Sequence, residues 1–167
     1  TRMRLSGKIE MSAFSLRDTV ESAVASVESK AGDKSIAINT NIEASLGQIS
    51  GNQFSIEEAV TNLLMNAIKY TPEHGRVTLS VKDEGDHVLI EVADTGIGIP
   101  EDELGCIFDE FYRASNARET ERDGTGLGLS IVKYVVERHG GQVQVESRLG
   151  HGAKFTLTLP KEPGRRQ

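Results

Sequence analysis

The chain has 167 residues, of which 37% are hydrophobic and 26% charged, a composition typical of one soluble globular domain and too apolar for disorder. Its net charge of −6 and its 5% of aromatic residues argue against a nucleic-acid partner, because such proteins neutralise phosphates and stack bases on aromatic rings. The single cysteine, Cys106, excludes an intramolecular disulfide, and no apolar run approaches the roughly 20 residues that span a bilayer. We therefore expect no nucleic-acid partner and no direct membrane contact for this part of the protein.

The first third of the chain predicts a linker, a helix and a strand. Residues 1–14 read as a linker or as the end of a preceding helix. Ser15, followed three residues later by Asp18, is typical of a helix N-terminus, and apolar residues at helical spacing then continue to Gly32. Residues 36–40 alternate in polarity, which predicts a short strand.

A second helix is predicted over residues 55–70, where Ser55 begins a capping pattern and Pro72 prevents continuation. Residues 76–83 and 87–92 alternate strongly and are separated by a short acidic turn, so they predict a hairpin.

The last part of the chain predicts two more helices and two more strands. The expected elements are a short helix at 101–111, a helix after the glycines at 124–128 that ends near residue 139, strands at 142–147 and 153–159, and a polar tail at 161–167. The strand pairs have hairpin spacing. The sequence therefore predicts an α+β fold, a two-layer sandwich of a mixed, mostly antiparallel sheet packed against about three helices.

The predicted helix 55–70 carries a narrow polar stripe. At about 100° per residue, Asn62, Asn66, Lys69 and Tyr70 lie on one side, and apolar residues occupy the remaining arc. Asparagine oxygens suit Mg²⁺, which prefers oxygen ligands, and a lysine suits phosphates. An ordinary solvated helix face would give the same pattern.

A first glycine cluster follows a predicted strand, at residues 94–100. Gly96 and Gly98 lack side chains, so a flat ligand could approach the backbone there. Asp94 can accept a hydrogen bond from the exocyclic amine of adenine, whereas guanine would present an acceptor to it. A type II turn at the end of a strand is the alternative.

Two further clusters lie at residues 124–130 and 150–153. The first lacks the lysine of a P-loop and follows a charged segment rather than a strand, so it is no dinucleotide fingerprint. It instead places backbone N–H groups at a helix N-terminus, a favourable position for phosphates. The second also fits a plain hairpin turn.

Taken in this order, the motifs resemble the ATP-binding domain of bacterial sensor histidine kinases, part of a superfamily with DNA gyrase, MutL and the large heat-shock chaperones. The resemblance covers about residues 10–160. The matching motifs are an asparagine box at 62–72, glycine boxes at 94–98, 124–130 and 150–153, and a phenylalanine box at 107–113.

The resemblance implies binding of ATP with Mg²⁺ as cofactors, under a mobile ATP lid formed by residues 101–123 and anchored by Phe108 and Phe111. It implies that Asn66 ligates Mg²⁺ and that Asn66, Lys69 and Arg113 take part in catalysis. The implied nucleotide contacts are Asn62, Asn66, Lys69, Tyr70, Asp94, Gly96, Ile97, Gly98, Gly124, Thr125, Gly126, Leu127, Gly128 and Leu129.

This chain departs from the family's pattern at two points that bear on the expected reaction. Hydrolysing relatives place a catalytic Glu four residues before the magnesium-binding Asn, and here that position is Asn62, which favours transfer to a protein side chain over hydrolysis. None of the four histidines resembles the family's phosphoacceptor. The acceptor is therefore expected on a separate dimerisation domain of the same or a sister chain, with a response regulator as an indirect partner.

The expected organisation is a linker or end of a dimerisation helix at 1–14, the catalytic domain at 15–160 and a polar tail at 161–167. The domain is expected in the cytoplasm, with an inner-membrane anchor for the whole protein left open. Two functions from different classes remain: a protein-histidine kinase, and a regulatory nucleotide-binding module without transfer activity.

Overall fold

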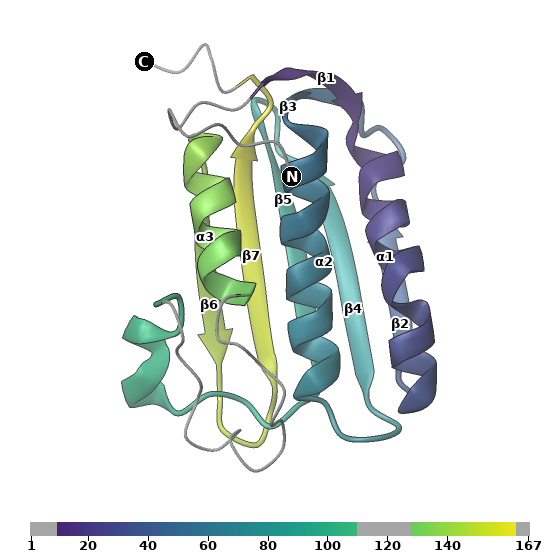
Figure 1. Cartoon of the computed structure of the whole chain (residues 1–167), viewed down its shortest axis with the longest axis vertical. Helices are drawn as coiled ribbons and strands as arrows, with labels where there is room; N and C mark the ends of the chain where they lie inside the picture. Colours follow the sequence, from purple (N-terminus) through teal and green to yellow (C-terminus); the bar gives the residue numbers. More distant parts are fainter. Residues whose placement is uncertain (1–9, 110–127, 163–167) are drawn as a thin grey trace.

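The structure, a computed structural model, describes residues 10–109 and 128–162. Figure 1 shows two layers, with three helices lying side by side on one face of a sheet. The helices are α1 (Leu16–Asp33), α2 (Gln53–Lys69) and α3 (Gly128–Arg138). The five strands lie in the order β2 (Ala37–Ile42), β4 (Arg76–Asp83), β5 (His87–Asp94), β7 (Ala153–Pro160) and β6 (Gln142–Ser147). The predicted α+β sandwich is confirmed.

The strand pairings also match the expected mixed, mostly antiparallel sheet. β4 pairs with β5, β5 with β7 and β7 with β6, all antiparallel, whereas β2 and β4 run parallel. The parallel pair arises because α2 lies between β2 and β4 in the chain, and a parallel connection needs such a crossover. The two predicted hairpins are therefore present, and β2 forms one edge.

The core lies between the sheet and the helices. Alternate residues of the three central strands point toward the helices, and Leu79, Ile90 and Leu157 are fully buried there. α2 packs against both α1 and α3, and its residues Leu63 and Leu64 are also fully buried. This double burial holds α2, which carries the polar stripe, in a fixed position over the middle of the sheet.

The two long helices begin with side-chain caps. The hydroxyl of Ser15 accepts a hydrogen bond from the N–H of Asp18, as predicted. For α2 the predicted cap, Ser55, was wrong. Asn52 is the cap, and its side-chain oxygen accepts from the N–H of Ser55, so the helix begins at Gln53. Asparagine caps as well as serine does, and Ser55 is the third helical residue.

A small second sheet was not predicted. β1 (Ser12–Ser15) pairs antiparallel with β3 (Gln48–Gly51), above the N-terminal end of α2 in Figure 1. The N–H of Ser50 also donates to the carbonyl of Lys161 at 2.7 Å. Strands of four residues leave too little alternation to be recognised from the sequence alone.

The predicted helix 101–111 is shorter than expected. A 3₁₀ helix, η1, spans Glu101–Cys106, and a turn follows in which the N–H of Asp109 donates to the carbonyl of Cys106. Residues 110–111 lie outside the described part of the chain. Across residues 10–109 and 128–162, no helix has the length and apolar character needed to cross a membrane.

Candidate nucleotide-binding site

The predicted polar stripe is present on α2. Asn62, Asn66 and Lys69 are half-buried, while the neighbouring apolar side chains are buried against the sheet and the flanking helices. The side chains of these three residues form no hydrogen bond or ion pair with the described part of the chain. None of the three side chains is thus committed to a contact within the described chain, and their role toward a ligand stays a prediction.

The last turn of α2 touches the first glycine cluster. The carbonyl of Tyr70 accepts a hydrogen bond from the N–H of Ile97 at 3.1 Å. A Cβ added at Gly96 would collide with the same carbonyl. Gly96 is thus required by the packing of the protein itself, a reason additional to the predicted approach of a ligand, which stays a prediction.

The end of α2 is held by a residue that the motifs did not indicate. The ammonium of Lys34, in the loop after α1, donates to the carbonyls of Ile68 at 2.8 Å and Lys69 at 3.1 Å. Both carbonyls lie at the C-terminal end of the helix, where the N–H of Thr71 reaches the carbonyl of Ile68 only at 3.4 Å, and a cation there also opposes the negative end of the helix dipole. No local pattern around Lys34 predicts this contact, because its partners lie 34 and 35 residues away.

Asp94 ends β5 and is oriented by two backbone groups. Its Oδ1 accepts hydrogen bonds from the N–H of Gly96 at 2.8 Å and the N–H of Ala153 at 3.2 Å. Among the described residues no donor reaches the other oxygen, Oδ2. The carboxylate is therefore fixed through one oxygen, and the contact of the other oxygen with a ligand donor stays a prediction.

Two opposing effects act on the pKa of the Asp94 carboxyl. Burial raises the pKa of its carboxyl above the ordinary 3.8, while the N–H groups of Gly96 and Ala153 oppose that rise. Burial also strengthens any hydrogen bond that the ionised carboxylate makes, since little water competes with it.

The third glycine cluster packs directly on Asp94. Gly152 has φ +90°, and a Cβ there would collide with the carbonyl of Asp94. The N–H of Gly150 donates to the carbonyl of Ile97 at 2.8 Å. The plain hairpin turn considered from the sequence is thus also a wall of the Asp94 site.

The structure therefore gathers three of the predicted motifs at one end of the molecule. The C-terminal end of α2, the end of β5 and the turn between β6 and β7 meet at the lower edge of Figure 1. His139, directly after α3, contacts Asn52 at the start of α2, so the two helices run in opposite directions. The first residues of α3, Gly128 and the half-buried Leu129, therefore lie at the same end of the molecule as these motifs.

Several predicted site residues lie outside the described part of the chain: Arg113, Gly124, Thr125, Gly126 and Leu127, together with Phe111 and most of the predicted lid. At the near end of that segment, Phe108 makes an edge-to-face contact with Phe155 on β7, with ring centroids 6.1 Å apart. Phe108 therefore attaches the chain after η1 to the sheet.

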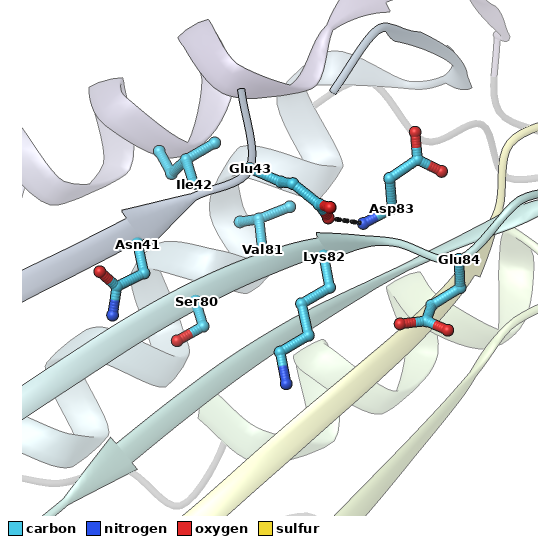
Figure 2. A pocket seen from close by; sticks show the side chains of 8 residues that line it. All are labelled: Asn41, Ile42, Glu43, Ser80, Val81, Lys82, Asp83 and Glu84. Carbon is cyan, nitrogen blue, oxygen red and sulfur yellow. Dashed lines mark hydrogen bonds between the residues drawn. The ribbon is translucent and has the colours of Figure 1, made fainter. Parts of the chain in front are cut away.

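A hollow lies at the end of β4 that is far from Asp94. Figure 2 shows the side chains that line it, from the ends of β2 and β4, and there Glu43 accepts a hydrogen bond from the N–H of Asp83 at 2.6 Å. The ammonium of Lys161 also pairs with Asp83 at 2.7 Å. The side chains of Glu43 and Asp83 are thus engaged in contacts within the protein, and no motif maps to this hollow.

Residues 51–163, about two thirds of the chain, match the family of histidine kinase-, DNA gyrase B-, and HSP90-like ATPases. The chain belongs to this ATPase family. The family binds ATP. The polar stripe, Asp94 and the glycine clusters of this ATPase domain all lie within the matched residues.

Curated relatives point to sensor histidine kinases. The ATPase domain is 33% identical over 156 residues to the circadian input-output histidine kinase CikA of Synechococcus elongatus, covering 92% of this chain and 21% of that protein. The chain thus spans about a fifth of the length of this relative.

Solved structures agree with this assignment. The catalytic domain of histidine kinase ThkA superposes with a TM-score of 0.82 at 28% identity, covering 95% of this chain and all of that one. Full-length ShkA, solved in complex with AMPPNP, gives a TM-score of 0.79 at 29% identity, over 92% of this chain and 31% of that one. ThkA in complex with the response regulator TrrA gives a TM-score of 0.78 at 25% identity, covering 93% of this chain and 43% of that one.

Proposed function

We propose that this ATPase domain binds Mg-ATP and transfers its γ-phosphoryl group to a histidine on a separate dimerisation domain, in two-component signalling. The observation that carries the proposal is the geometry of Asp94. Two backbone N–H groups hold Oδ1, and Oδ2 is left to accept the adenine amine. Guanine would present a carbonyl to the same oxygen and leave two acceptors facing each other.

The residues proposed for the phosphate end are Asn62, Asn66 and Lys69, on the polar stripe of α2. Asn66 offers a half-buried amide oxygen without a partner in the described chain, which suits a hard cation that prefers oxygen ligands. Among the described residues, no group of three acidic, histidine or cysteine side chains is arranged to hold a metal ion. Mg²⁺ fits such a site, because it commonly takes few protein ligands and completes its shell with phosphates and waters.

In this proposal Asn62 supports Asn66, and Lys69 with Tyr70 contacts the nucleotide and its phosphates. When bound, Mg²⁺ would neutralise charge on the phosphates. Arg113, Gly124, Thr125, Gly126, Leu127, Gly128 and Leu129 are proposed to complete the phosphate side. The chain itself contributes mainly position and electrostatics, as is usual for phosphoryl transfer.

The transfer step needs an acceptor nitrogen. A histidine nitrogen would form a bond to the γ-phosphorus while the bond to the bridging oxygen breaks and ADP leaves. Asn62 occupies the position of the hydrolytic Glu and is a poor base, so water is the weaker competitor for the phosphoryl group. ThkA, a structural neighbour, was solved with a response regulator, and we propose such a protein as the indirect partner here.

The decisive experiment incubates the chain with radiolabelled ATP, with and without the histidine-bearing dimerisation domain of its own full-length protein. We expect acid-labile label on the added domain, and no label on this chain alone. Binding of ATP with no label on any acceptor would instead identify a regulatory nucleotide-binding module. A labelled band on the chain alone would contradict the assignment of a separate acceptor.

A further inference from the structure

Ser147, the last residue of β6, joins two of the glycine clusters through its hydroxyl group. The oxygen accepts a hydrogen bond from the N–H of Ile99 at 2.8 Å, and the hydroxyl donates to the carbonyl of Gly152 at 2.9 Å. The two partners come from the loop after β5 and from the turn before β7. One half-buried side chain thus ties the loops on both sides of Asp94 to each other.

The carbonyl that Ser147 binds belongs to the same planar peptide unit as the N–H that orients Asp94. The unit runs from the carbonyl of Gly152 to the N–H of Ala153, and that N–H donates to Oδ1 of Asp94 at 3.2 Å. In a trans peptide these two groups point in opposite directions, so fixing one fixes the other. The Gly152 carbonyl also accepts a hydrogen bond from the N–H of Arg148 at 3.2 Å, so the Ser147 hydroxyl, at the shorter distance, is one of two donors that orient this peptide unit.

We propose that Ser147 is a positioning residue for adenine recognition, acting through the Gly152–Ala153 peptide on the carboxylate of Asp94. The proposal rests on the proposed role of Asp94 in binding the adenine amine. Four groups form one chain of hydrogen bonds: Ile99 N–H, the Ser147 hydroxyl, the Gly152–Ala153 peptide and Asp94 Oδ1. Each bond in such a chain polarises the next and strengthens it.

The final bond of this chain depends on that support. At 3.2 Å the bond from Ala153 lies at the long end of the normal range, whereas the bond from Gly96 at 2.8 Å is short. Without the hydroxyl, only the N–H of Arg148 at 3.2 Å holds the Gly152 carbonyl, so the Gly152–Ala153 peptide can tilt and release Oδ1. The carboxylate, held then by Gly96 alone, can rotate, and Oδ2 no longer points in one direction toward the amine.

An isosteric pair of variants tests this role. Ser147→Thr keeps the hydroxyl and Ser147→Val removes it while keeping the same shape, and both residues favour strands. Affinity for ATP and for inosine triphosphate, whose base carries a carbonyl in place of the amine, is measured by calorimetry for both variants and the wild type. Because the two nucleotides share the same phosphates, the ratio of their affinities isolates the contact with the base.

We expect Ser147→Val to bind ATP about 3- to 10-fold more weakly than Ser147→Thr, the range for a lost neutral hydrogen bond, with inosine triphosphate affected less than about twofold. The proton resonance of the Ala153 amide should move upfield in Ser147→Val and stay in place in Ser147→Thr. A residue that only stabilises the fold would weaken both nucleotides equally.

The outcomes separate the two proposals. If the wild type prefers ATP but Ser147→Val and Ser147→Thr show the same preference and the same Ala153 resonance, Ser147 does not position Asp94. If the wild type binds both nucleotides equally, the proposed recognition of adenine by Asp94 is contradicted, and the proposed role of Ser147 is contradicted with it. Thermal unfolding of all three proteins identifies any loss of affinity that comes from unfolding.

Discussion

The imidazole of His139 accepts a hydrogen bond from the backbone N–H of Asn52 at 3.0 Å, although 87 residues separate the two in the chain. Its other nitrogen, Nδ1, donates to the carbonyl of Val135 at 2.8 Å. Both bonds require the neutral ring with its proton on Nδ1. The ring is 1% exposed and lies against Gly51, so one buried histidine joins the end of α3 to the start of α2.

This contact predicts a loss of stability in acid. Burial lowers the pKa of His139 below the ordinary 6.5, so the folded protein resists protonation while the unfolded chain takes up the proton. The free energy of unfolding should therefore fall as the pH drops below about 6.5, by at most about 1.4 kcal/mol for each unit by which the pKa is lowered. Gly51 and Asn52, which lie at the ring, carry no charge that could compensate.

Urea unfolding of the wild type and of His139→Gln between pH 7.5 and 5.5 measures this effect. The variant lacks the titrating group, so the difference in stability between the two proteins should shrink as the pH falls. Subtracting the variant also removes the contribution of Asp94, whose raised pKa acts in the opposite direction. A constant difference across this range would contradict the prediction.

Asp94→Asn should abolish most of the affinity for ATP without unfolding the protein. The asparagine oxygen can keep both backbone bonds, from Gly96 and Ala153, so its amide nitrogen takes the place of Oδ2 and faces the adenine amine donor. We expect a loss of about 2–3 kcal/mol in binding, measured by calorimetry, with a thermal midpoint close to that of the wild type. Near-normal affinity would exclude Asp94 as the adenine contact.

Acidification should weaken the preference for adenine. Because burial raises the pKa of Asp94, its carboxyl takes up a proton at a pH above its ordinary 3.8, and a protonated carboxyl is a poorer acceptor. The ratio of ATP to inosine triphosphate affinity should therefore decline as the pH falls through that raised pKa. The same ratio measured for Asp94→Asn provides the control, because it should not change over this range.

Asn66→Ala should weaken Mg-ATP more than it weakens ATP in the presence of a chelator. The variant loses an oxygen ligand, for which Mg²⁺ accepts few substitutes, and phosphoryl transfer should fall further than binding. Asn41→Ala is the matched control, since Asn41 is an exposed residue on β2 at the edge of the sheet. Equal losses with and without Mg²⁺ would show that Asn66 is not the metal ligand.

Two glycine substitutions should change stability in opposite directions. Gly96→Ala places a Cβ against the carbonyl of Tyr70 and should cost about 1–3 kcal/mol of unfolding free energy, and ATP affinity with it. Gly32→Ala, in the last turn of α1 with open space around it, should instead stabilise the protein by up to about 1 kcal/mol. Chemical denaturation of both variants checks this. An unchanged free energy of unfolding for Gly96→Ala would contradict the close packing of α2 on the first glycine cluster.

Local patterns were sufficient for most of the fold. Alternation predicted both hairpins, helical spacing predicted α1 and α2, and the order of elements predicted the two-layer sandwich. The predicted start of α2 was wrong because Asn52 and Ser55 are both good caps, and the choice between them depends on contacts that Asn52 makes outside the helix. Its side chain also donates to the carbonyl of Glu10, 42 residues earlier.

The sequence by itself determined which groups could meet a nucleotide: an acid directly after a strand, amides and a lysine along one side of a helix, and glycines where backbone must come close. Those features depend on residues near in the chain, whose spacing sets their geometry. Only the tertiary structure decided how Asp94 is held, because Ala153 lies 59 residues away and Ser147 lies 48 residues beyond Ile99. Such contacts form when the sheet closes and distant strands become neighbours, and no local periodicity records which backbone groups then meet.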